Sequence, residues 1–120
     1  RDAILSDTLP LVMVPMLPLD LVTDHADVVK IDVQGGEVDV LKGAPKLLTR
    51  CPVWVLEIWP RGLGHAHKPL REILQRMAVA GLRPHWMHGA DVAGPASEDE
   101  LLAWALTCGD NGFVNLVFRA

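Results

Sequence analysis

The sequence predicts an α/β fold in which strands and helices alternate along one mostly parallel sheet. Two apolar, β-branched runs at 28–33 and 53–58 are each followed by a helical pattern, and a further strand pattern comes at 113–118. Alternation of this kind is typical of layered α/β domains with right-handed crossovers. The last connection holds only a short helix, so we expect the final strand to pair antiparallel with its neighbour.

Length and charge limit the classes of protein to which the chain can belong. Its 120 residues, half of them hydrophobic, are enough for one small domain with a core. A net charge of −4 and the lack of a basic stripe argue against a nucleic-acid partner. No apolar run is long enough to span a bilayer, and the N-terminal residues lack a signal-peptide pattern, so no membrane partner is expected. Cys51 and Cys108 lack metal-type spacing, and as reduced thiols they favour a cytoplasmic location.

The first strand and helix follow an irregular lead-in expected over residues 1–27, in which Leu11 to Met16 can form a short strand limited by Pro15. Val28 to Val33 is rich in β-branched residues, which predicts a strand ended by the Gly35-Gly36 pair.

The helix predicted from Glu37 to Leu48 contains Gly43 and Pro45. Pro45 cannot donate to the carbonyl of Leu41, so we expect the helix to be kinked or split there.

The second strand, Val53 to Ile58, is nearly continuous apolar sequence, which predicts coverage on both faces. A loop over 59–68 precedes a helix that begins near Pro69 and ends at Gly81.

A third strand over 82–88 contains Pro84, so we place it near an edge of the sheet. Ser97 and Glu100 form a capping box before the last helix, and Phe113 to Phe118 is the final strand.

Two acids stand at the ends of the first two predicted strands. Asp32 and Glu57 therefore lie at the carboxyl edge of the sheet, where open α/β sheets bind ligands. Lys30 shares a strand side with Asp32. Two interpretations stay open: Lys30, Asp32 and Glu57 form a cluster that neutralises itself, or Asp32 orients an acceptor group or takes its proton.

The loop after Glu57 carries further candidates. His65 and His67 are expected either to be solvated or to bind an acceptor, and Trp59 can floor an acceptor pocket. With Asp32 and Glu57, the two histidines also allow a metal-dependent hydrolase as an alternative. Glu37 and Asp39 are explained by the helix dipole.

Four segments in order carry a family resemblance: Leu19-Asp20; Lys30-Ile31-Asp32-Val33 with Gly35 and Glu37; Val40-Leu41-Lys42-Gly43-Ala44; and Val55-Leu56-Glu57-Ile58. Their order and spacing resemble the FkbM-type methyltransferases, which use S-adenosylmethionine. Gln34 stands where the family usually has Glu, and Gly36 replaces a usual Ala.

The resemblance implies a Rossmann-like methyltransferase fold and O-methylation of a hydroxyl on a small molecule or glycan. The implied catalytic residues are Asp32, Lys30 and Glu57, the cofactor is S-adenosylmethionine at Asp32, Val33, Gln34 and Gly35, and the acceptor contacts are Trp59, His65 and His67. No metal is implied.

Nothing before Val28 supplies the glycine-rich turn or the ribose-binding acid of such enzymes. We therefore expect residues 1–120 to be one partial domain, the C-terminal half of the methyltransferase sheet, which can be inactive alone. The remaining alternative is a non-catalytic α/β module that self-associates through the open edge of its first strand.

Overall fold

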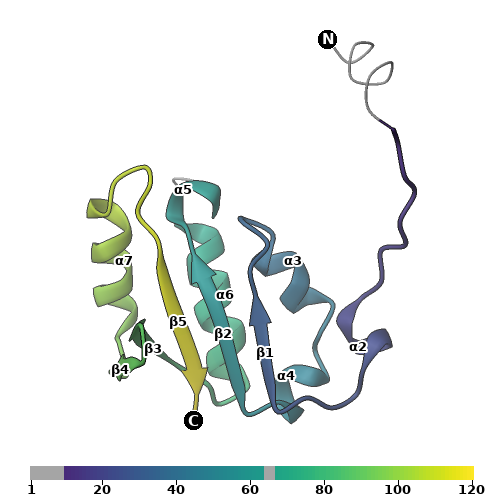
Figure 1. Cartoon of the computed structure of the whole chain (residues 1–120). Coiled ribbons are helices and arrows are strands. Elements are labelled where there is room, and N and C mark those ends of the chain that lie inside the picture. Colours follow the sequence, from purple (N-terminus) through teal and green to yellow (C-terminus); the bar gives the residue numbers. More distant parts are fainter. Residues whose placement is uncertain (1–9, 64–66) are drawn as a thin grey trace.

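Five strands and six helices follow one another in the computed structural model, which describes residues 10–63 and 67–120 (Figure 1). The strands are β1 (Val28–Ile31), β2 (Val53–Ile58), β3 (Arg83–His88), β4 (Asp91–Ala93) and β5 (Val114–Arg119). The helices are α2 (Leu19–Val22), α3 (Glu37–Lys42), α4 (Leu47–Arg50), α5 (Pro60–Leu63), α6 (Lys68–Val79) and α7 (Glu98–Thr107). None of these helices is long and apolar enough to cross a membrane.

The strands form one mixed sheet in the order β1-β2-β5-β3-β4. β1 and β2 pair in parallel, with Ile31 opposite Leu56. β5 lies antiparallel between β2 and β3, as predicted for the final strand. The prediction of a mostly parallel sheet is not confirmed. Because β5 separates β2 from β3 and β4 folds back on β3, only the β1–β2 pairing is parallel among the described strands.

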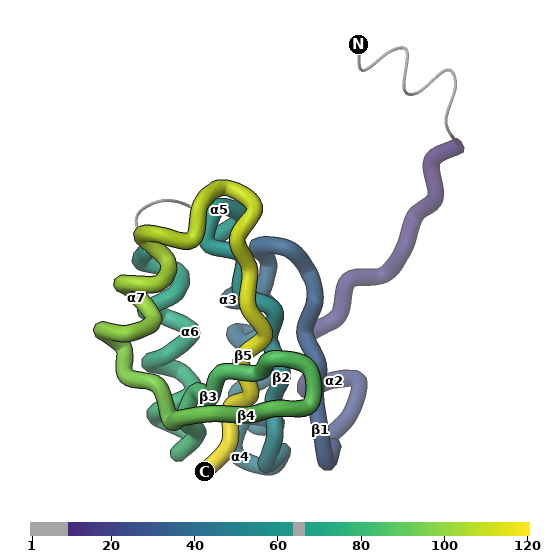
Figure 2. The backbone as a smooth tube through the Cα atoms, turned by 60° about the vertical axis from the view of Figure 1, so that its left-hand side comes forward, coloured from purple at the N-terminus to yellow at the C-terminus, as the bar shows by residue number. Residues whose placement is uncertain are grey.

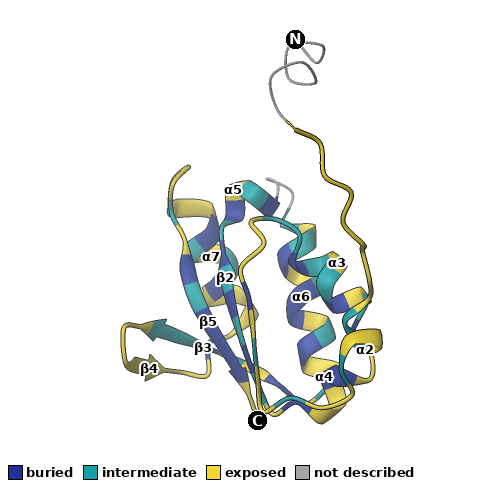
Figure 3. Ribbon diagram, turned by 45° about the vertical axis from the view of Figure 1, so that its right-hand side comes forward, coloured by how far each residue is buried: buried dark blue, intermediate teal, exposed yellow. Residues whose placement is uncertain are grey.

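The helices cover one face of the sheet (Figure 3). On β2, Trp54, Leu56 and Ile58 are fully buried in the core, whereas the alternating Val53 and Val55 are half-buried. The prediction that this strand is covered on both faces is therefore wrong. Side chains alternate along a strand, and within the described residues helices pack only against the side that carries Trp54.

Several local signals in the sequence are confirmed. The helical pattern after β1 splits into α3 and α4 at Gly43 and Pro45. Pro69 lies in the first turn of α6, and Gly81 follows that helix with φ +79°. The Ser97 hydroxyl accepts a hydrogen bond from the backbone N–H of Glu100 at 3.1 Å, which caps α7.

Other expectations are wrong. Leu11 to Met16 forms no strand, and its large apolar side chains are exposed (Figure 1). α2 lies within the lead-in that was expected to be irregular, and β1 ends at Ile31, two residues early. The β3–β4 hairpin was not predicted, because β4 has only three residues and only Gly89 marks its turn.

Asp20 joins α2 to the start of α4. Its carboxylate accepts hydrogen bonds from the backbone N–H of Lys46 at 2.8 Å and of Leu47 at 3.0 Å, and its own N–H donates to the carbonyl of Gly43. The carboxylate of Asp20 in α2 therefore caps α4. The side chain of the N-cap residue Lys46 makes no capping hydrogen bond.

Replacing this cap tests its contribution to stability. We expect Asp20→Ala to lower the free energy of unfolding by about 1–2 kcal/mol, because two backbone donors lose a charged acceptor. Asp20→Asn retains one acceptor oxygen and should lose less. Urea denaturation measures both, and an unchanged midpoint in Asp20→Ala would contradict this role.

Candidate functional site

Three connections meet at the end of the sheet where β1 and β2 terminate. They are the β1–α3 turn, the β2–α5 connection and the α7–β5 loop, and Figures 1 and 2 show them at the same end of the molecule. Since Ile31 pairs with Leu56, the residues that follow, Asp32 and Glu57, come at the same level of this edge.

The β1–α3 turn passes very close to the backbone of α5. Gln34 and Gly35 both have positive φ angles, +46° and +103°. A Cβ atom added at Gly35 would lie 2.5 Å from the carbonyl oxygen of Gly62. A side chain at position 35 would therefore be strained twice, by the backbone conformation and by the neighbouring backbone.

Trp59 links the β2–α5 connection to the α7–β5 loop. Its indole N–H donates to the carbonyl of Asp110 at 2.9 Å, and the Arg61 guanidinium pairs with the Asp110 carboxylate at 3.2 Å. The indole ring also packs against Gly62, where an added Cβ would clash with it. These contacts hold three loops in one fixed arrangement.

A pocket of about 210 Å³ opens between these loops. Its lining residues come from all three of them and from the end of β2: Gln34, Glu57, Trp59, Asn111 and Phe113. Directly opposite Glu57 on β5 stands Asn115, whose Oδ1 atom is buried without a hydrogen-bond partner among the described residues.

Glu37, which the sequence pattern attributes to the helix dipole, is a buried acid. Only 1% of its surface is exposed. One carboxylate oxygen accepts a hydrogen bond from the N–H of Gly35 at 3.0 Å, while the other is buried without a partner in the described part of the chain. Burial raises the pKa of Glu37, hydrogen bonds from the N–H groups of Glu37 and Gly35 oppose this, and the nearby charges of Asp32 and Glu57 raise it further. The helix dipole alone does not account for this residue.

The predicted catalytic residues lie at this edge without neutralising one another. Asp32 is exposed immediately after β1, and Lys30 is exposed beside Val55 of the neighbouring strand. Within the described residues, no ion pair joins Lys30 to Asp32 or Glu57. The self-neutralising cluster is therefore not formed, which leaves Asp32 accessible to a ligand.

His67 and the remaining cofactor candidates lie around the same loops. Val33 and Gln34 are exposed beside Asp32. His67 lines a separate hollow of about 110 Å³ with Arg61 and Asp110. His65 lies outside the described residues. Over 10–63 and 67–120, no three acid, histidine or cysteine side chains gather in a way that could hold a metal ion.

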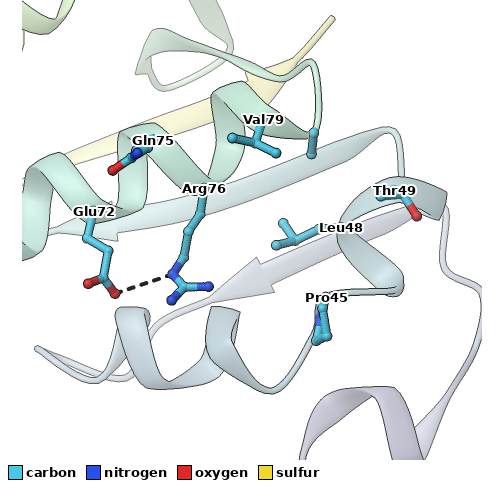
Figure 4. Close-up of a pocket in the computed structure, with 8 residues that line it drawn as sticks. Pro45, Leu48, Thr49, Glu72, Gln75, Arg76 and Val79 are labelled. Carbon is cyan, nitrogen blue, oxygen red and sulfur yellow. Dashed lines mark hydrogen bonds and ion pairs between the residues drawn. The ribbon is translucent and has the colours of Figure 1, made fainter.

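A larger hollow of about 440 Å³ lies between α4 and α6 (Figure 4). Its walls include Leu48 and Val79, and Glu72 pairs with Arg76 across one turn of α6 at 3.3 Å. It contains none of the predicted site residues, and α4 leads into the start of β2, at the opposite end of that strand from Glu57. Its size alone does not make it the functional site.

Comparison with known proteins bears on the edge that carries Asp32. A family model described as the Methyltransferase FkbM domain matches residues 6–81. The match contains every predicted site residue, whereas α7, β5 and the loop between them lie beyond it. Searches of curated proteins and of solved structures found no match.

The buried carboxyl of Glu37 predicts a pH-dependent stability. Its pKa in the folded state is raised above the ordinary 4.5, so the folded state holds this proton more tightly than the unfolded state. The contribution of Glu37 to the free energy of unfolding is therefore greatest below pH 4.5 and falls as the pH rises towards the raised value.

Glu37→Gln keeps an oxygen that can accept from Gly35 and removes the charge. We expect the wild type to lose stability relative to this variant as the pH rises above 4.5. Chemical denaturation across the pH range measures the difference, with Asp39→Asn on the exposed side of α3 as the control. A difference that does not change with pH would contradict the prediction.

Proposed function

The chain belongs to the FkbM methyltransferase domain family, and on this premise we propose that it takes part in methyl transfer from S-adenosylmethionine to a hydroxyl group of a small molecule or glycan. The observation that carries the proposal is a pair of acids at the ends of two parallel strands inside the matched region: Asp32 directly follows β1, and Glu57 is the last but one residue of β2. Crevices beyond the carboxyl ends of such strands are where α/β sheets bind ligands.

The residues at this edge suit a positively charged methyl donor. S-adenosylmethionine, when bound, supplies a methyl group on a cationic sulfur. Asp32, Val33 and Gln34 are exposed and can be reached by it, and the uncompensated carboxylates of Asp32 and Glu57 match its charge. The turn at Gly35 brings backbone rather than a side chain to this place.

The part of Asp32 and Glu57 in the reaction follows from the needs of methyl transfer. The acceptor oxygen forms a bond to the methyl carbon while the carbon–sulfur bond breaks and its electrons stay on sulfur. The acceptor hydroxyl loses its proton, and we assign that proton to Asp32, with Glu57 orienting the hydroxyl. Lys30 adds a positive charge on β1, two residues before Asp32. Most of the acceleration comes from holding the three reacting atoms in line.

These 120 residues offer the cofactor one set of contacts, Asp32 to Gly35, and no glycine-rich turn after an earlier strand. We therefore expect weak binding of S-adenosylmethionine, with a dissociation constant well above micromolar. In a two-dimensional NMR titration, millimolar cofactor should shift backbone amides of residues 32–36 and leave those of α6 unchanged.

Two variants sharpen this titration. Asp32→Asn should reduce the shifts, because it removes a carboxylate charge that would attract the cationic cofactor, whereas Asp39→Asn should retain them. Unmoved amides at 32–36 in millimolar cofactor would remove these residues from the cofactor site. Submicromolar affinity would contradict the expectation of weak binding.

A second candidate function is that of a non-catalytic module that associates through the open edge of its sheet with another protein or with a second copy of the chain. The observation in its favour is the unpaired edge of β1, the outer strand of the sheet. β1 pairs with β2 only, as far as the described residues go, and Val28 on this strand is 57% exposed. Unpaired strand edges with apolar side chains favour association.

Light scattering after size-exclusion chromatography tests this function. We expect the apparent mass to rise with protein concentration and Val28→Lys to lower it, because a charge on an edge strand opposes pairing. Val79→Lys, on the exposed side of α6, is the matched control. A monomer at every concentration would count against assembly between copies.

A further inference from the structure

The pocket of about 210 Å³ is lined by residues from inside and from outside the region that matches the family model. Gln34, Glu57 and Trp59 come from the matched region, whereas Asn111 and Phe113 come from the α7–β5 loop beyond it. The Trp59–Asp110 hydrogen bond at 2.9 Å fixes that loop against β2. The α7–β5 loop is thus held at the pocket by a hydrogen bond.

The kinds of side chain in the pocket point to a ligand with two different surfaces. Trp59 and Phe113 supply aromatic rings, and Phe113 is 59% exposed although its side chain is large and apolar. Glu57, Gln34 and Asn111 supply oxygen acceptors, and none of these three side chains makes a hydrogen bond or ion pair to another described residue. A ligand with an apolar ring face and hydroxyls at its edge fits this lining, since the Glu57 carboxylate accepts hydrogen bonds and the two amides both accept and donate them.

A further polar residue, Asn115, stands next to Glu57 in the sheet. Asn115 pairs with Glu57 across β2 and β5, so the two side chains share one face of the sheet. The Oδ1 atom of Asn115 is buried without a partner among the described residues, which is costly for folding. Asn115 does not line the pocket, so a ligand there would contact Glu57 and not this buried oxygen.

The volume of the pocket selects the size of the ligand. Sites for drug-sized molecules hold about 300–1,000 Å³, so 210 Å³ accommodates a single small ring and leaves any larger remainder outside. A pyranose ring has that size, C–H bonds on its two faces and hydroxyls around its edge. An amine or a purely aliphatic alcohol meets only some of these conditions.

We infer that this pocket binds one sugar ring of the acceptor, stacked on Trp59 and Phe113, with hydroxyls donating to Glu57 and Asn111. Phe113 and Asn111 are then specificity-determining residues contributed by the α7–β5 loop. The inference rests on the proposed methyl transfer only for calling this ring the acceptor, since binding of a sugar can be measured without the reaction.

NMR with methyl glycosides tests the inference on the full chain. The probes are the methyl α-glycosides of glucose, mannose, galactose and fucose, compared with cyclohexanol and ethanolamine at the same millimolar concentrations. We expect at least one glycoside to shift the Trp59 indole N–H and Asn111 side-chain amide peaks. Trp59→Phe identifies the indole peak among the four tryptophans.

Variants separate the pocket from unspecific contact. Phe113→Ala should weaken binding of the active glycoside by about threefold to tenfold, because it removes one stacking ring. Glu57→Gln should weaken it through the lost charged acceptor. Val79→Ala removes apolar surface from α6 and should leave the affinity unchanged.

Three results would overturn the inference: no glycoside moves these peaks, cyclohexanol moves them equally, or Phe113→Ala binds as the wild type does. Failure of cofactor binding is seen at residues 32–36 and failure of sugar binding at Trp59 and Asn111. The two proposals can therefore fail separately.

Discussion

The candidate site depends on how closely the backbone after β1 approaches the backbone after β2. At position 35 there is no room for a Cβ atom, because the Gly62 carbonyl occupies that place. Gly62 in turn leaves space for the ring of Trp59, which bonds to Asp110 in the loop before β5. Each contact fixes the next, so three loops from distant parts of the sequence are held together on one side of the candidate site. Rigid loops of this kind hold polar groups in place before a ligand arrives.

The two sides of the sheet have different physical roles. One side carries Trp54, Leu56 and Phe118, which are fully buried against the helices and supply the hydrophobic stabilisation of the fold. The other carries Val53 and Val55, half-buried, beside the exposed Lys30. Asp32 and Glu57, the acids at the ends of β1 and β2, stand where the sheet meets the loops and lie outside this core.

Sequence patterns predicted elements whose signals are local. The split at Gly43 and Pro45, the cap at Ser97 and the stop at Gly81 depend on one or two residues, and all are confirmed. Asp32 and Glu57, at the ends of β1 and β2, were predicted from local signals too, whereas the residues that surround them were not. The burial of Glu37 and the approach of Gly35 to Gly62 depend on contacts across the chain, and no local pattern marks them. The apolar run of β2 predicted two covered faces because composition cannot show which elements will pack on each side.

The place of β5 in the sheet has a consequence for the order of folding. β5 lies between β2 and β3, although both of these strands precede it in the sequence. During synthesis β2 and β3 therefore have no shared neighbour until residues 114–119 leave the ribosome, and the buried side chains of Leu116 and Phe118 are missing from the core until then. Such long-range pairing slows folding and prolongs exposure of unpaired strands. The core side of β2 and β3 therefore stays incomplete until β5 has inserted between them.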